Sequence, residues 1–113
     1  MHELGLVVEV VRIVEDVARE QGLTKIEAVV LRIGALSPVV PHYVEKCFPA
    51  ATHGTLLEGA RLEIEVPPAN GRCRACGAVA DVVANRRTCP DCGGKEWELH
   101  GGREFSIHRI VAC

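Results

Sequence analysis

The sequence predicts an α/β protein in which a small three-stranded sheet packs with two helices and a zinc-ribbon lobe is inserted before the last strand. Three observations support this prediction. Valines recur at helical spacing near the N-terminus, short segments rich in β-branched residues follow, and four cysteines form two close pairs late in the chain. A chain of 113 residues is long enough for one hydrophobic core and a small appendage.

The two helices are predicted from periodicity. Residues 3–21 carry apolar side chains at helical spacing opposite a charged stripe, and Gly22 follows as a stop. Residues 39–52 predict a second helix. Pro49 lies inside it, and proline removes a backbone donor and clashes with the preceding turn, so we expect this helix to kink or end there.

Three strands are predicted for the sheet. Residues 26–33 are rich in β-branched side chains, and residues 61–66 alternate apolar with charged side chains. Residues 105–111 supply a last strand that can return to the same sheet. Prolines at 67 and 68 and glycines at 101 and 102 interrupt the pattern. We therefore predict one domain formed by residues 1–67 and 103–113, and a second formed by residues 68–102.

The predicted second domain contains the strongest motif of the chain. Its cysteines are spaced C-x2-C-x12-C-x2-C, at Cys73, Cys76, Cys89 and Cys92. In a reducing compartment this spacing indicates metal ligands rather than disulfides. Zinc accepts four thiolates in a tetrahedron, so we predict a closed, structural Zn(II) site that supplies most of the folding free energy of this domain.

Two alternatives remain for the cysteine unit. The segment Cys89 to Gly93 is similar to one metal-binding turn of rubredoxin, which holds iron, although Trp97 is the only aromatic residue nearby. The second alternative is an adaptor that binds protein or nucleic acid. Its candidate contacts are Arg72, Arg74, Arg86 and Arg87. Four acidic side chains and the charge of a zinc tetrathiolate offset these cations, so nucleic-acid binding is disfavoured.

The first three residues form a second candidate metal site. The α-amine of Met1 with the deprotonated amide and the imidazole of His2 can close fused chelate rings that place three nitrogens in one plane. Glu3 can supply a further donor. Planar, nitrogen-rich coordination suits Ni(II) or Cu(II). The alternative interpretation of His2 is an exposed histidine that binds no metal.

Charge and composition exclude several classes of function. The formal net charge of -2 argues against a protein that binds nucleic acid or an anionic membrane through charge. No apolar stretch approaches the length of a spanning helix, and the N-terminus lacks the features of a secretion signal, so we expect a cytoplasmic protein without membrane partners. The sequence contains no catalytic constellation, and we expect no enzymatic activity.

Several segments together resemble the HypA/HybF family of hydrogenase nickel-incorporation proteins. They are Met1 to Leu4, Leu31 to Ser37, Gly59 with Ala60, and the four-cysteine insert. The resemblance implies a nickel metallochaperone for nickel-iron hydrogenase maturation. It places transferable Ni(II) at His2 and Glu3, and structural Zn(II) at the four cysteines.

The resemblance also implies partners. These are a nickel-insertion GTPase and the precursor of the hydrogenase large subunit, and some family members also serve urease. The sequence departs from the family pattern at two positions. Gly5 stands where the family commonly has serine, which weakens helix initiation beside the nickel site, and Pro49 interrupts a helix that is usually continuous.

Overall fold

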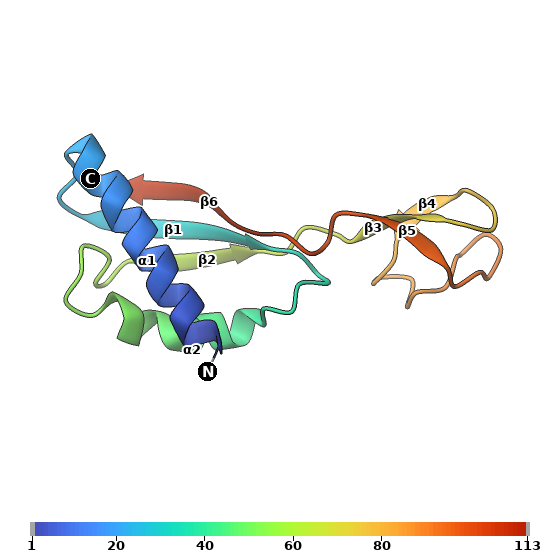
Figure 1. Ribbon diagram of the computed structural model, residues 1–113, viewed down its shortest axis with the longest axis horizontal. Coiled ribbons are helices and arrows are strands. Elements are labelled where there is room, and N and C mark those ends of the chain that lie inside the picture. Colours follow the sequence, from blue (N-terminus) through green and yellow to red (C-terminus); the bar gives the residue numbers. More distant parts are fainter. Residues whose placement is uncertain (1, 113) are drawn as a thin grey trace. The chain divides into compact units, whose positions relative to one another are not determined.

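The chain forms two compact units in a computed structural model that describes residues 2–112, with the side chain of His2 outside the description. Unit 1 comprises Met1–Arg32, Val39–Glu65 and Ser106–Cys113, and unit 2 comprises Ile33–Pro38 and Val66–Phe105. The elements, labelled in Figure 1, are α1 (His2–Gln21), β1 (Ile26–Ile33), α2 (Pro41–Thr52), β2 (Arg61–Glu65), β3 (Asn70–Cys73), β4 (Val79–Asp81), β5 (Trp97–His100) and β6 (Phe105–Ala112).

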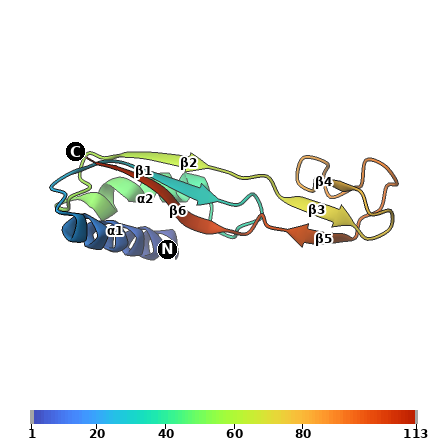
Figure 2. The ribbon, with the colours of Figure 1, turned by 90° about the horizontal axis from the view of Figure 1, so that it is seen from above.

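Unit 1 contains both helices and a three-stranded sheet of order β2-β1-β6. Strands β1 and β2 are parallel, with Ala28 opposite Arg61, and α2 connects them. Figure 1 shows β6 running opposite to β2, and Figures 1 and 2 together place both helices on one face of the sheet. Because β1 is the central strand, most of its side chains are buried. The predicted sheet and helices are confirmed.

Helix α1 follows its sequence pattern closely. Val7, Val14 and Ala18 on its apolar face are buried, and Arg12 bonds to Asp16 at 2.9 Å on the exposed face. The helix ends at Gly22, whose φ of 70° is the left-handed conformation that glycine adopts without strain. Gly5 does not prevent helix formation, since α1 begins at His2.

Helix α2 does not end at Pro49, so that part of the prediction is wrong. The helix continues to Thr52. Pro49 lies in the last turns, where few residues follow and where the lost donor affects one hydrogen bond to the carbonyl of Glu45. The Thr52 hydroxyl donates to the carbonyl of Phe48 at 2.9 Å, which satisfies a carbonyl near the helix end. Cys47 is buried on α2.

Unit 2 contains a second three-stranded sheet of order β4-β3-β5, which the sequence analysis did not predict. Strand β3 pairs antiparallel with both neighbours, so that Arg72 lies opposite Val79 on β4 and Glu98 on β5. The amide of Leu36 donates to the carbonyl of Gly102 at 2.6 Å, which joins residues 33–38 to the rest of this unit. Neither helix in the described chain is long and apolar enough to cross a membrane.

Candidate metal centre

Unit 2 brings together the four cysteines that the sequence analysis selected. Their Sγ atoms all lie within 4.8 Å of one another, in a group formed by Cys73, Cys76, Cys89 and Cys92. The sulfurs are paired across the two motifs: Cys73 lies 3.6 Å from Cys92, and Cys76 lies 3.6 Å from Cys89. Cys73 ends β3, Cys76 and Cys92 lie in turns, and Cys89 directly precedes the second of these turns.

The two cysteine turns have the same backbone hydrogen bonds. The amide of Cys73 donates to the carbonyl of Ala78 at 2.8 Å, and the amide of Cys89 donates to the carbonyl of Gly94 at the same distance. Gly77 and Gly93 close the turns with φ of 79° and 77°. Glycine adopts this conformation without strain, so each C-x2-C-G segment aims two sulfurs at one point.

The sulfur cluster is only half buried. Cys73 and Cys89 are 1% and 2% exposed, whereas Cys76 and Cys92 are exposed. Spacing fixes which sulfurs converge, but it does not determine which side of the cluster faces the core.

Proximity and backbone donors shift the pKa values of the thiols. The amides of Cys76 and Ala75 lower the pKa of Cys73 to about 7. The amide of Gly94 lowers the pKa of Cys92, but hydrogen bonds with Cys73 and the other thiols outweigh it and raise that pKa to about 12. The amide of Ala78 lowers the pKa of Cys76, but hydrogen bonding with Cys89 and burial outweigh it, so that this pKa is raised as well. Four adjacent thiolates require a cation to offset their charge.

The geometry fits a tetrahedral metal ion and excludes disulfides. A tetrahedron with metal–sulfur bonds of about 2.3 Å has sulfur–sulfur edges of about 3.8 Å, close to the 3.6 Å separations of the two cross-motif pairs. A disulfide requires sulfurs about 2.05 Å apart. All four ligand positions of such an ion would be filled by protein, which leaves no open position for a substrate.

Gly94 belongs to this site and was missed by the sequence analysis. A Cβ built at this position would lie 3.2 Å from the sulfurs of both Cys73 and Cys92. Its amide also lies 3.4 Å from the sulfur of Cys92. The second glycine after Cys92 was the available signal, since a residue that close to a thiolate pair must be small.

The predicted N-terminal site lies largely outside the described residues. Met1 and the side chain of His2 are not described, and Glu3 is a half-buried residue in the first turn of α1. Two of the three predicted nickel ligands therefore have no described side-chain geometry.

Comparison with known proteins gives the family. The model for hydrogenase/urease nickel incorporation, metallochaperone, hypA matches residues 1–112. The chain belongs to the HypA family. The hydrogenase maturation factor HypA of Moorella thermoacetica is 45% identical over 107 residues, which cover 95% of each chain. That of Chlorobaculum tepidum is 42% identical over 111 residues, which cover 98% of each chain.

Two solved HypA structures have the same fold. The solution structure of the Ni metallochaperone HypA from Helicobacter pylori gives a TM-score of 0.65 at 21% identity, covering 97% of this chain and 96% of that chain. A second solution structure of HypA protein gives 0.71 at 23% identity, covering 100% of this chain and 97% of the other. The predicted family and α/β fold are confirmed.

Proposed function

We propose that this chain is a nickel metallochaperone that binds Ni(II) at its N-terminus and delivers it during nickel-iron hydrogenase maturation. Met1, His2 and Glu3 hold the transferable ion, and a structural Zn(II) stays with the four cysteines. The match to the HypA family over residues 1–112 carries this proposal. In this proposal the nickel site belongs to the predicted domain of residues 1–67 and 103–113, and the zinc site belongs to the predicted domain of residues 68–102.

The chemistry of the N-terminus supports a nickel site there. Helix α1 begins at His2, and the first N–H groups of a helix have no partner within it. The amides of His2 and Glu3 therefore do not have to break helical hydrogen bonds before they bind a metal. The positive end of the helix dipole also favours the deprotonated amides that a planar nickel chelate uses.

The donor set of the cysteine cluster supports zinc as its resident ion. Zn(II) has no geometric preference of its own, and four thiolates at tetrahedral spacing satisfy it completely. Iron in a rubredoxin-like centre uses the same donors. A colourless preparation that contains one zinc per chain would favour zinc, and a coloured, iron-containing one would contradict this assignment.

The nickel site is tested with untagged protein in a nickel titration. His2→Ala should abolish Ni(II) binding, because it removes the imidazole that closes the chelate, and zinc content should not change. His53→Ala is the matched control, since its side chain is 83% exposed and lies in the same unit. Extension of the N-terminus with a tag should have the effect of His2→Ala. Nickel affinity that is indifferent to both changes would place the site elsewhere.

The proposed role includes a location and partners. The chain acts in the cytoplasm as a carrier rather than an enzyme, and its partners are a nickel-insertion GTPase and the hydrogenase large-subunit precursor. A nitrogen chelate at the chain end is accessible to an acceptor protein. Transfer is tested by mixing nickel-loaded chain with the apo-GTPase and measuring nickel in each after separation. Nickel that stays with the chain under these conditions would contradict delivery.

A further inference from the structure

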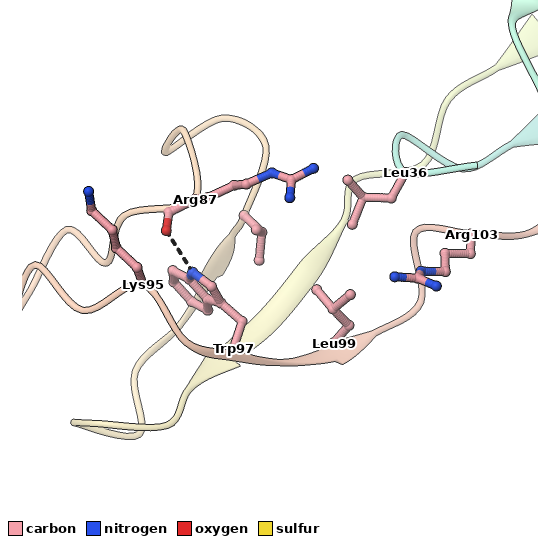
Figure 3. A pocket seen from close by; sticks show the side chains of 7 residues that line it. Leu36, Arg87, Lys95, Trp97, Leu99 and Arg103 are labelled. Carbon is pink, nitrogen blue, oxygen red and sulfur yellow. Dashed lines mark hydrogen bonds between the residues drawn. The ribbon is translucent and has the colours of Figure 1, made fainter. Parts of the chain in front are cut away.

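Unit 2 contains a cavity of about 250 Å³ that apolar and basic side chains line. Four apolar side chains line it: Leu36, Val82, Trp97 and Leu99. Figure 3 shows Leu36 and Leu99 facing the same space that Trp97 borders. All of these residues belong to unit 2, so the cavity lies within one compact body.

Three cations complete the lining of this cavity. They are Arg87, Lys95 and Arg103. In Figure 3 the guanidinium groups of Arg87 and Arg103 extend toward the space beside Leu36. Among residues 2–112, no carboxylate lies within ion-pair distance of these three cations, although exposed ion pairs are common in unit 1. The cavity therefore combines apolar surface with unneutralised positive charge.

Three acidic side chains of unit 2 make contacts away from these cations. Side chains alternate along β5, so Trp97 and Leu99 line the cavity while Glu98 lies on the other face, where its carboxylate is 3.4 Å from His100. The carboxylate of Asp81 accepts the amides of Val83 and Ala84 at 3.0 Å. That of Glu104 accepts the amide of Gly102.

The Trp97 ring is held in place by a hydrogen bond to a backbone segment of uncommon conformation. The indole Nε1 of Trp97 donates to the carbonyl of Arg87 at 3.0 Å. Arg86 and Arg87 have φ of 54° and 63°, a conformation that non-glycine residues seldom adopt. Strained backbone of this kind persists where surrounding structure imposes it, and it is concentrated at binding and catalytic sites. The hydrogen bond keeps the ring in position before any ligand arrives.

We propose that this cavity docks an acidic peptide segment of a partner protein, with one apolar side chain in the cavity and carboxylates on Arg87, Lys95 and Arg103. Charge complementarity identifies the occupant, because guanidinium groups pair with carboxylates through two parallel hydrogen bonds. The apolar side chains of the cavity contact the anchor residue, as in other peptide-recognition sites. Nickel binding at the N-terminus is not required for this docking.

The cavity fits a peptide better than it fits nucleotides or nucleic acid. A volume of about 250 Å³ holds one large side chain, whereas sites for small-molecule ligands occupy about 300–1,000 Å³. Single-stranded nucleic acid binds to successive aromatic side chains, and Trp97 is the only tryptophan of the chain. Three basic side chains around one aromatic ring suit a peptide in which one apolar residue is flanked by acidic residues.

Trp97 also provides the measurement. The metal-loaded full chain is titrated with a capped peptide in which leucine is flanked on both sides by aspartate and glutamate, and tryptophan emission is recorded. We expect a saturable change in emission and an affinity that falls with added salt, because the contacts are charged. A peptide with asparagine and glutamine in place of the acids should bind about tenfold more weakly or worse.

Matched variants assign the effect to the cavity. The double variant R87Q/R103Q should weaken binding of the acidic peptide about tenfold or more. Arg72→Gln is the control, because Arg72 lies opposite Glu98 in the register and so projects from the face of the sheet away from Trp97. This control should bind as the parent does. Metal content and circular dichroism verify that each variant is folded.

Three outcomes would overturn the proposal. The first is emission that the acidic peptide leaves unchanged, or an affinity that R87Q/R103Q does not reduce. The second is an oligonucleotide or ATP that binds more tightly than the peptide with the same arginine dependence, which would make the cavity a phosphate site. The third is a concentration-dependent change in Trp97 emission without peptide, which would make its occupant a second copy of this chain.

Discussion

Removal of the metal ion should unfold unit 2 and leave unit 1 folded. Apart from the cysteines, the described residues of unit 2 bury three apolar side chains almost completely, Ile33, Ala69 and Val82. Unit 1 buries the valine face of α1, most of β1, and Phe48 of α2. A small unit with so little buried apolar surface needs a metal ion or disulfides to fold.

The expected magnitude follows from the ligand set. A structural zinc ion contributes about 10–16 kcal/mol to the folding of a small domain at neutral pH. This exceeds the stability of a typical small domain, so metal-free unit 2 should be unfolded. Near the midpoint, each tenfold decrease in free metal should reduce the stability of unit 2 by about 1.4 kcal/mol.

Two spectroscopic probes separate the units. Trp97 lies in unit 2, and both helices lie in unit 1. Titration with a strong chelator should shift Trp97 emission to longer wavelength, because unfolding exposes the half-buried indole to water. The far-ultraviolet circular dichroism of the helices should persist. Metal-free protein with unchanged tryptophan emission, or joint loss of both signals, would refute the reasoning.

Three further predictions concern single residues. Gly94→Ala should weaken metal binding about tenfold in a competition titration, because the added Cβ would lie 3.2 Å from two cluster sulfurs. An unchanged metal affinity would contradict this geometry of the site. Gly5→Ala should raise the free energy of unfolding of unit 1 by about 0.5–1 kcal/mol in a denaturant titration, since the added Cβ meets no atom within 4 Å and alanine favours the helix. An unchanged free energy of unfolding would show that α1 frays at this position. Arg32 donates a hydrogen bond to the Glu65 carboxylate at 2.9 Å, which lowers the pKa of that carboxyl below its ordinary value. The ion pair therefore stabilises the fold at any pH above the ordinary pKa of the carboxyl, and this stabilisation is lost as the pH falls through the lowered pKa. Glu65→Gln should therefore lower the melting temperature at neutral pH and not at about pH 2, and an equal effect at both would exclude the ion pair as the cause.

The elements of unit 1 could be predicted because their patterns are local. The valines of α1 repeat with the helical period over 20 residues, and β1 is rich in β-branched side chains. The convergence of the four sulfurs follows from two short cysteine turns that each contain a glycine. In these cases each segment carries the information for its own geometry.

The rest of unit 2 depends on contacts between distant residues. Strands β3, β4 and β5 have three or four residues each, too few to establish an alternating pattern. The cavity is formed by side chains as far apart in sequence as Leu36 and Arg103. The exposure of Cys76 is another tertiary property, because it depends on which side of the cluster is covered. No pattern within a single segment encodes any of these features.

The exposed half of the sulfur cluster changes the argument for how a resident ion is retained. Burial protects Cys73 and Cys89, but solvent and competing ligands have access to Cys76 and Cys92. Retention must therefore come from coordination. When one metal–sulfur bond breaks, the other three thiolates still hold the ion, and the turn keeps the released sulfur close enough to bind again. Because metal binding displaces the thiol protons, acid weakens this site as it weakens a nitrogen chelate. Coordination by four thiolates, rather than burial, then accounts for the retention of an ion at this cluster.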